Sequence, residues 1–306
     1  MIDRLIDRIE ELEAPIVVGL DPLPEMIPDR IKRRAAETWG PNLKAAAEML
    51  FEFNKEIIDG VCGAVPAVKP QIAMYERFGP EGVTAYAKTA AYAKGKGLFV
   101  IGDVKRGDIS STAEAYAAHI AGTEFGGERF EPWGEDAVTL NPYLGTDSVQ
   151  PFIRACEKYD KAVFMLVKTS NPSSAELQDL TVGDGGKTVY ERVADMTSSW
   201  GESTIGASGY SKVGAVVGAT HPEQGASLRR RMAHTFFLVP GYGAQGASGK
   251  DLRGFFDAAG RGCIVNSSRG IIAAWKSGDR YGENDVGEAA LAAALAMKED
   301  LRKARE

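Results

Sequence analysis

Residues 99–112 read FVIGDVKRGDISST, and this stretch contains the repeating unit of the fold. Its first four residues are apolar or glycine, charged residues follow, and a segment of helical composition begins at residue 112. A continuous apolar run is typical of a strand that is buried on both faces, as in a parallel sheet. The stretch therefore predicts a strand, a charged strand end and a following helix.

The same unit recurs along the chain. Further apolar runs occupy residues 16–20, 65–68, 137–140, 162–167, 213–218, 235–239 and 262–265, and helical segments include 42–61, 80–93, 112–120, 222–232 and 286–305. Eight strands that alternate with helices predict the α/β class, as one (β/α)8 TIM barrel domain over residues 1–306. A doubly wound open sheet is the alternative, because strands are easily miscounted from one sequence.

Two stretches exceed a minimal barrel, and two short motifs predict helix starts. Residues 122–135 and 171–186 are expected to be insertions, the second either a lid over a ligand or a surface insertion without a role. Ser111-x-x-Glu114 and Thr220-x-x-Glu223 have capping-box spacing. Asp108 is an alternative cap to Ser111.

The composition limits the class of protein. The 306 residues are 44% hydrophobic and 25% charged, as in ordinary globular proteins. A net charge of −6 argues against a nucleic-acid binder, which usually has a basic face. The three distant cysteines predict neither a disulfide scaffold nor a zinc site. No run approaches the roughly 20 apolar residues of a membrane span, and the acidic start is unlike a secretory signal. We therefore expect a cytoplasmic protein without a membrane partner.

The polar residues that follow the apolar runs are the candidate site residues, because barrel enzymes carry their chemistry at the carboxyl ends of the strands. They are Asp21, Lys69, Asp103, Lys105, Asp108, Asn141, residues 168–171, Thr220, His221, residues 241–246 and residues 266–269. Charges at a barrel mouth are costly unless they are paired. Here lysines and aspartates are both available to pair.

The charged cluster after the third run has a spacing that brings its groups together. Side chains alternate along a strand, so Asp103 and Lys105 are expected on one side, with Val104 opposite. Asp108 follows near the start of the next helix, four residues before Thr112. Taken alone, the short pattern DxKxxD is also explained by a salt bridge and a helix cap at a strand end.

Six strand-end motifs together make a more specific pattern. They are GLDP at 19–22, VKPQ at 68–71, DVKRGDISST at 103–112, VKTSNP at 167–172, PGYGAQG at 240–246 and NSSRGI at 266–271. In these motifs the chain resembles orotidine 5′-phosphate decarboxylases of the longer prokaryotic type, over nearly the whole barrel. The resemblance implies a carboxy-lyase of de novo pyrimidine synthesis, without cofactor or metal, that converts orotidine 5′-phosphate into uridine 5′-phosphate.

The resemblance also implies a role for individual residues. Those implied to be catalytic are Lys69, Asp103, Lys105 and Asp108, an array of alternating charge in which Lys105 protonates C6 of the pyrimidine. Those implied to bind substrate are Asp21 and Thr112 near the ribose, Ser170 or Asn171 at the base, and Gly243, Gln245, Ser268 and Arg269 at the phosphate. The implied assembly is a homodimer with shared active sites, in which Asp108 and Thr112 serve the neighbouring subunit.

The residue types suit this reaction on physical grounds. Loss of CO2 leaves negative charge on a carbon, and a fixed ammonium beside that carbon stabilises the charge and then delivers a proton. Asp103 and Asp108 are expected to keep Lys105 protonated and in place. Repulsion between Asp103 and the departing carboxylate contributes only about 4 kcal/mol at ~4 Å and an effective dielectric of ~20. Enzymatic acceleration requires roughly 8–23 kcal/mol, so stabilisation of the transition state must dominate.

The glycine-rich motif at 241–246 fits GxGxxG but not a dinucleotide site. It follows the seventh strand instead of opening a first βαβ unit. The loops after strands seven and eight, with the start of an extra helix, form the usual phosphate site of such barrels. Arg269 is suited to bind the phosphate there. Taken alone, the glycine-rich stretch is also explained by a flexible turn, and Arg269 by a cation on the protein surface.

Two other functions stay open at this point. Sugar-phosphate decarboxylases and hexulose-phosphate synthases share DxKxxD, but they resemble each other in using Mg²⁺. The positive charge of Lys69 would oppose the binding of such a metal and therefore favours the orotidine 5′-phosphate decarboxylases. A phosphate-ligand binder without catalysis is the third possibility. The scattered histidines and cysteines form no metal motif.

Overall fold

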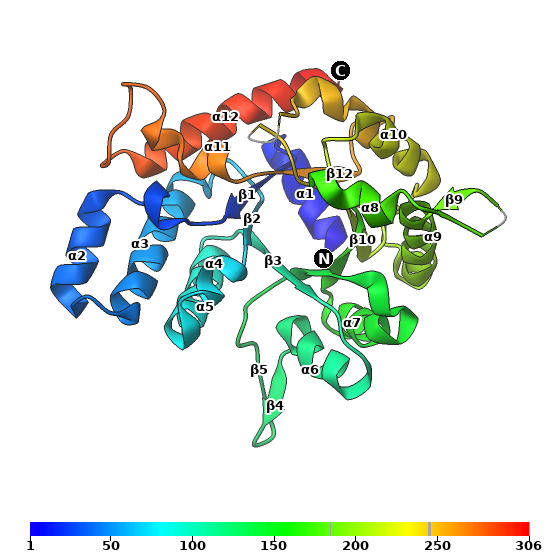
Figure 1. The fold of residues 1–306 in the computed structure, drawn as a ribbon, viewed down its shortest axis with the longest axis horizontal. Helices are drawn as coiled ribbons and strands as arrows, with labels where there is room; N and C mark the ends of the chain where they lie inside the picture. Colours follow the sequence, from blue (N-terminus) through cyan, green and yellow to red (C-terminus); the bar gives the residue numbers. More distant parts are fainter. Residues whose placement is uncertain (184, 244–245, 306) are drawn as a thin grey trace.

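Eight strands close a parallel barrel in this computed structural model, which describes residues 1–183, 185–243 and 246–305 (Figure 1). The strands are β1 (Ile16–Leu20), β2 (Ala67–Pro70), β3 (Phe99–Arg106), β6 (Ala137–Leu140), β7 (Ala162–Lys168), β10 (Val213–Val217), β11 (Phe237–Val239) and β12 (Cys263–Ser267). Pairing of β1 with β12, with Ile16 opposite Val265, completes the ring. The predicted (β/α)8 barrel is confirmed, and the open sheet is wrong.

Helices surround this barrel and connect its strands. They are α1 (Ile2–Leu12), α2 (Asp29–Trp39), α3 (Leu43–Val61), α4 (Ala73–Glu76), α5 (Gly79–Gly95), α6 (Ser110–Ala121), α7 (Thr146–Tyr159), α8 (Ala175–Gln178), α9 (Val189–Gly201), α10 (Pro222–Arg231), α11 (Arg269–Ile272) and α12 (Val286–Arg305). The five predicted helical segments correspond to α3, α5, α6, α10 and α12. A 3-10 helix, Gly249–Phe255, lies between β11 and β12.

Both predicted capping boxes are wrong. Helix α6 begins at Ser110, so Ser111 lies inside its first turn, and no side chain caps the preceding Ile109. The Asp108 carboxylate accepts a hydrogen bond from its neighbour Ile109 N and is not the cap either. Helix α10 begins at Pro222, whose fixed φ and missing N–H suit the first helical position. The Thr220 hydroxyl instead donates to the Ser170 carbonyl.

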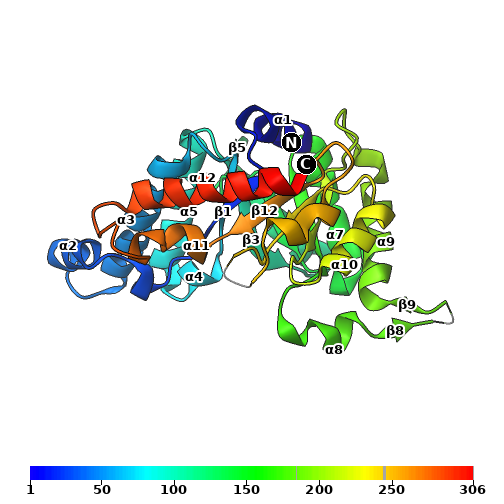
Figure 2. The same cartoon turned by 90° about the horizontal axis from the view of Figure 1, so that it is seen from above.

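The amino ends of the strands are sealed, and this leaves the carboxyl ends for chemistry. Four apolar side chains of α1, Ile2, Leu5, Ile6 and Ile9, are buried in one cluster with inward-facing strand residues such as Ile101. Each such aliphatic side chain contributes about 1.5–3 kcal/mol when fully buried. Figure 2 shows α1 at one end of the barrel and α8 at the opposite end.

The predicted insertion at 122–135 contains a hairpin, and the one at 171–186 contains α8 and the first strand of a second hairpin. Strands β4 (Thr123–Phe125) and β5 (Glu128–Phe130) project from the barrel, while β8 (Thr181–Val182) and β9 (Lys187–Thr188) follow α8 (Figure 1). Among the described residues, no helix combines the length and apolar character needed to cross a membrane.

Candidate active site

A bulge at the end of β3 sets the geometry of the charged cluster. The pairing of β3 with β6 shifts between Gly102 and Arg106, and Lys105 has a φ of 46°, in the left-handed region that a residue with a side chain rarely adopts. The bulge takes the Lys105 N–H out of the strand ladder. The hydroxyl of Thr139 on β6 accepts it at 3.0 Å. Strained backbone held by a neighbouring strand is frequent at functional sites.

Asp103 is the centre of the cluster. Its Oδ2 accepts from Lys69 Nζ at 2.7 Å and from Gln71 Nε2 at 2.9 Å. Its Oδ1 accepts from Lys105 Nζ at 2.5 Å and from the Thr139 hydroxyl at 3.0 Å. The carboxylate therefore lies between two ammonium groups, and four side chains fix its orientation.

Burial and pairing act against each other at this cluster, and pairing prevails. Asp103 is 7% exposed, and its burial acts to raise its pKa, but attraction to Lys69 and Lys105 and their hydrogen bonds hold that pKa well below its usual range. Burial of Lys69 acts to lower its pKa, but Asp103 and Asp21 raise it above its ordinary value. Both groups of this pair are therefore charged at neutral pH.

Lys105 differs from Lys69 in its exposure. The side chain of Lys69 is 6% exposed, whereas that of Lys105 is 45% exposed while still bonded to Asp103. Lys69 is thus a fixed internal cation. Lys105 presents its ammonium to the barrel mouth, where a bound molecule can meet it.

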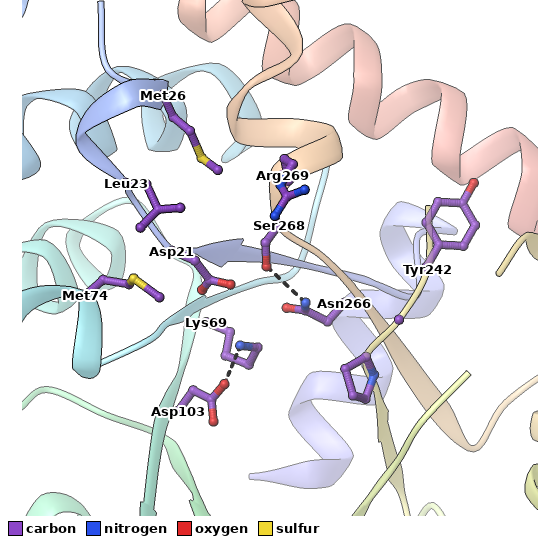
Figure 3. Close-up of a pocket in the computed structure, with 12 residues that line it drawn as sticks. Asp21, Leu23, Met26, Lys69, Met74, Asp103, Tyr242, Asn266, Ser268 and Arg269 are labelled. Carbon is purple, nitrogen blue, oxygen red and sulfur yellow. Dashed lines mark hydrogen bonds and ion pairs between the residues drawn. The ribbon is translucent and has the colours of Figure 1, made fainter. Parts of the chain in front are cut away.

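Two cavities meet at the Lys69–Asp103 pair, and both also touch Pro240. The first, of about 330 Å³, we call the polar cavity (Figure 3). It is lined by Asp21, Leu23, Met26, Lys69, Met74, Asp103, Pro240, Gly241, Tyr242, Asn266, Ser268 and Arg269. The second, of about 380 Å³, we call the apolar cavity. It is lined by Lys69, Asp103, Lys105, Thr139, Leu166, Thr169, Ser170, Asn171, Val216, Leu238 and Pro240.

The polar cavity contains polar atoms that lack a partner. Asp21 Oδ1 and Asn266 Oδ1 are buried without a hydrogen bond to any residue that the structure describes. Such orphan acceptors are rare and call for a ligand donor such as a hydroxyl group. Asn266 Nδ2 donates to Ser268 Oγ at 3.2 Å (Figure 3). Arg269, the first residue of α11, supplies a guanidinium at the same cavity.

Close packing of β1 against the end of β12 shapes this polar cavity. A Cβ at Gly19 would lie 1.9 Å from Ser268 Oγ and 3.0 Å from Asn266 Oδ1. Only glycine at position 19 allows both side chains to reach the cavity beside Asp21.

The structure brings most, but not all, of the predicted site residues together. The polar or apolar cavity is lined by Asp21, Lys69, Asp103, Lys105, Ser170, Asn171, Ser268 and Arg269. Asp108, Thr112 and Gly243 line neither cavity. Gln245 lies outside the described residues.

Asp108 does not flank Lys105 within one chain, and its predicted role in the neighbouring subunit's site stays a prediction. No ion pair joins Asp108 to Lys105 in the described parts of the chain, and the Asp108 side chain bonds to Ile109 N. After the bulge the chain turns away from the cavities. Asp108 therefore does not contact Lys105 of its own chain, although it is only three residues away in the sequence.

Two polar residues of the cluster were not singled out from the sequence. Gln71 follows β2 directly and was quoted only as part of a motif. Asn266, within the predicted range 266–269, lies in β12 and lines the polar cavity. Thr139 lies inside the apolar run of β6, and only its pairing with β3 shows that it faces Asp103.

The chain is similar to known proteins in sequence and in structure. Residues 14–279 match the model of the orotidine 5′-phosphate decarboxylase / HUMPS family. The orotidine 5′-phosphate decarboxylase of Rhodopirellula baltica is 45% identical over 93% of each chain, and that of Caldicellulosiruptor saccharolyticus is 41% identical over 99% of this chain and 98% of its own. The structure of Leishmania donovani OMP decarboxylase is 34% identical, with a TM-score of 0.73 and 98% of each chain covered.

Proposed function

This chain belongs to the orotidine 5′-phosphate decarboxylase / HUMPS family, and on that premise we propose that it decarboxylates orotidine 5′-phosphate to uridine 5′-phosphate with Lys105 as the proton donor to C6. One observation carries the proposal. Asp103 holds Lys69 and Lys105 on its two oxygens at the junction of a polar and an apolar cavity. A nucleotide has a polar ribose phosphate and a flat base, and these two parts match the two cavities.

The proposed binding mode follows the chemistry of the linings. The phosphate lies near Arg269, whose planar guanidinium suits an anion with several oxygens. The ribose hydroxyls donate to the orphan oxygens of Asp21 and Asn266. The pyrimidine enters the apolar cavity past Ser170 and Asn171. C6 then lies beside the Lys105 ammonium.

The proposed reaction has two events at C6. The bond between C6 and the carboxylate breaks, CO2 departs, and the electron pair stays on C6. An N–H of the Lys105 ammonium then gives its proton to C6, and solvent reprotonates the amine. A preorganised ammonium stabilises the developing charge without reorganisation at the moment of reaction.

The negative charge of Asp103 maintains its ion pairs with Lys69 and Lys105. Because its pKa is depressed, it stays an anion at neutral pH, and it holds Lys105 in place. Three cations, Lys69, Lys105 and Arg269, line the two cavities against two carboxylates, Asp21 and Asp103, so the site has a net positive charge in this subunit. That charge favours a substrate that carries both a carboxylate and a phosphate.

We further propose that the enzyme works as a homodimer of single-domain barrels, in which Asp108 and Thr112 reach the partner's active site. The surface beside them supports this. Ile109 is 50% exposed and Tyr143 is 79% exposed, and the two segments are joined by the hydrogen bond from Asn141 N to Arg106 O. Exposed apolar side chains beside a barrel mouth suit contact with a second copy of the chain.

A metal-free assay tests the reaction. Purified protein is stripped with a chelator, mixed with orotidine 5′-phosphate, and followed by the absorbance change of the pyrimidine. Full activity is expected, because the Lys69 cation supplies the positive charge where the Mg²⁺-dependent relatives would need a metal. Activity that requires added Mg²⁺, or that is found only with a sugar phosphate as substrate, contradicts the proposal.

We also propose a cytoplasmic location. The three free cysteines agree with the reducing conditions of that compartment.

A further inference from the structure

One carboxylate oxygen of the C-terminal helix binds both ends of the glycine-rich loop. Asp300 lies on α12, after the last of the six strand-end motifs in the sequence. Its Oδ2 accepts from the Tyr242 hydroxyl at 2.8 Å and from Gly249 N at 2.7 Å. The segment between these two donors is the loop that follows β11, of which residues 244 and 245 lie outside the described residues.

The loop is closed at its base by its own backbone. Gly243 N donates to the Ala247 carbonyl at 2.8 Å, and Tyr242 and Ala247 form an isolated bridge. The two ends therefore lie next to each other, where a single acceptor can bind both. Asp300 is that acceptor.

Tyr242 connects this anchor to the polar cavity. Gly241 and Tyr242 line the cavity together with Ser268 and Arg269. Figure 3 shows the ring of Tyr242 directed away from the Lys69–Asp103 pair and toward α12. Burial, and then the hydrogen bond to Asp300, raise the pKa of the Tyr242 hydroxyl, so it stays protonated and donates. The Tyr242 hydroxyl therefore donates its hydrogen bond to α12 and not to a ligand.

Gly249 shows how close the loop must come to α12. A Cβ at this position would lie 2.5 Å from the Asp300 carbonyl oxygen and 2.9 Å from its Oδ2. Glycine is therefore required for the contact.

We propose that Asp300 is a positioning residue, which holds Tyr242, and with it the cavity wall formed by Gly241 and Tyr242, in place for the phosphate group and so favours the nucleotide over its nucleoside. The inference rests on the proposed function, since it assumes that the phosphate lies in the polar cavity. Asp300 does not touch the substrate. It acts through Tyr242 and Gly249, which hold the wall of that cavity.

The test compares two substrates. In Asp300→Ala, kcat/KM for orotidine 5′-phosphate is expected to fall roughly tenfold to a hundredfold, the usual cost of a misplaced binding group. For orotidine, which has no phosphate, kcat/KM should stay within about twofold, because only the phosphate-dependent part of transition-state binding is lost. In Asp300→Asn the amide oxygen can accept both hydrogen bonds, so activity on the nucleotide should return.

Matched variants separate this role from simple folding. Glu299→Ala changes the neighbouring acidic residue of α12, which forms ion pairs with Arg302 and Lys303 of its own helix, and should leave activity on both substrates unaffected. Tyr242→Phe removes one of the two hydrogen bonds and should give a smaller loss on the nucleotide alone. If Asp300→Ala fails to fold, Asp300→Asn and Tyr242→Phe still carry the test. An equal loss on both substrates, or no loss, overturns the inference. Native enzyme that does not act on orotidine 5′-phosphate overturns the proposed function instead.

Discussion

Lys69 Nζ and Asp103 Oδ2 lie 2.7 Å apart, and this buried ion pair forms the wall between the two cavities of the barrel mouth. The ammonium of Lys69 is buried with the carboxylate as its hydrogen-bonded partner. A buried charge is tolerated only when such a partner is present. The pair therefore links the stability of the barrel to the electrostatics of the site.

Removal of one partner is expected to cost more stability than removal of both. In Asp103→Leu the Lys69 ammonium stays buried without its carboxylate, which should cost about 3–5 kcal/mol in the free energy of unfolding. The double variant, Lys69→Met with Asp103→Leu, should be more stable than this single variant. Urea unfolding measures both values. A double variant that is no more stable than Asp103→Leu contradicts the argument.

The pH dependence of stability follows from the two shifted pKa values. The pKa of Asp103 lies below its ordinary 3.8, so its contribution is complete above that pH and is lost as the pH falls through the lowered pKa. The pKa of Lys69 lies above its ordinary 10.5, so its contribution is complete below that pH and is lost as the pH rises through the raised pKa.

We therefore expect a plateau with losses on both sides. The difference in the free energy of unfolding between the native protein and the double variant, which lacks both groups, should be constant between about pH 5 and 9. It should change only at more extreme pH. Urea titrations at several pH values measure it. A slope near neutral pH is incompatible with these pKa directions.

Lys105→Ala is expected to abolish turnover but keep nucleotide binding. Loss of proton transfer alone costs roughly 10²–10⁴-fold in kcat, and loss of the preorganised cation adds to that. Uridine 5′-phosphate should still bind, because the polar cavity is unchanged. Steady-state kinetics and calorimetry provide the two measurements. Lys88→Ala, at a surface ion pair with Glu48, is the control and should be fully active. A fully active Lys105→Ala variant would remove the mechanism.

The barrel and the centre of the site could be predicted because both depend on local patterns. Continuous apolar runs mark strands that are buried on both faces, and the residues that follow them meet at one end of a barrel. Lys69, Asp103 and Lys105 were found in this way. Thr139 was not, since its position inside a strand gives no polar signal until the register with β3 is known.

The predicted helix start that failed depends on how the backbone turns at the end of β3. Lys105 and Ser110, on either side of Asp108, both have left-handed φ values, which the sequence does not reveal. The same turn places the start of α6 one residue before the predicted Ser111 cap. The link from Asp300 to the loop after β11 could not be predicted, because no sequence pattern shows which helix residue faces a loop some 50 residues earlier.

Shared active sites make a prediction for mixed variants. If Lys105 and Asp108 of different subunits form one site, Lys105→Ala and Asp108→Ala should each be strongly impaired. Mixing the two should restore activity, because each heterodimer holds one intact site. At random exchange about a quarter of the native activity per subunit is expected for a twofold dimer. Activity after mixing that equals the average of the two variants alone would contradict shared sites.

The insertion at 171–186 has contacts that favour a role in the site. Gln178, on α8, accepts from Thr169 N at 3.0 Å, and its amide donates to the Thr169 hydroxyl at 2.7 Å. That hydroxyl donates in turn to Asn171 Oδ1 at 2.6 Å. Thr169 and Asn171 line the apolar cavity. Gln178 therefore holds the wall that we propose for the pyrimidine.

Gln178→Ala is accordingly expected to raise KM for orotidine 5′-phosphate roughly tenfold, since two hydrogen bonds of about 0.5–1.5 kcal/mol each are lost. The fall in kcat should be smaller, because Lys105 and Asp103 keep their geometry. Glu176→Ala, an exposed change on the same short helix, is the control and should leave KM unchanged. Steady-state kinetics on the three proteins decide between the two interpretations of this segment. Equal KM values for all three would mean that it is a surface insertion without a role in binding.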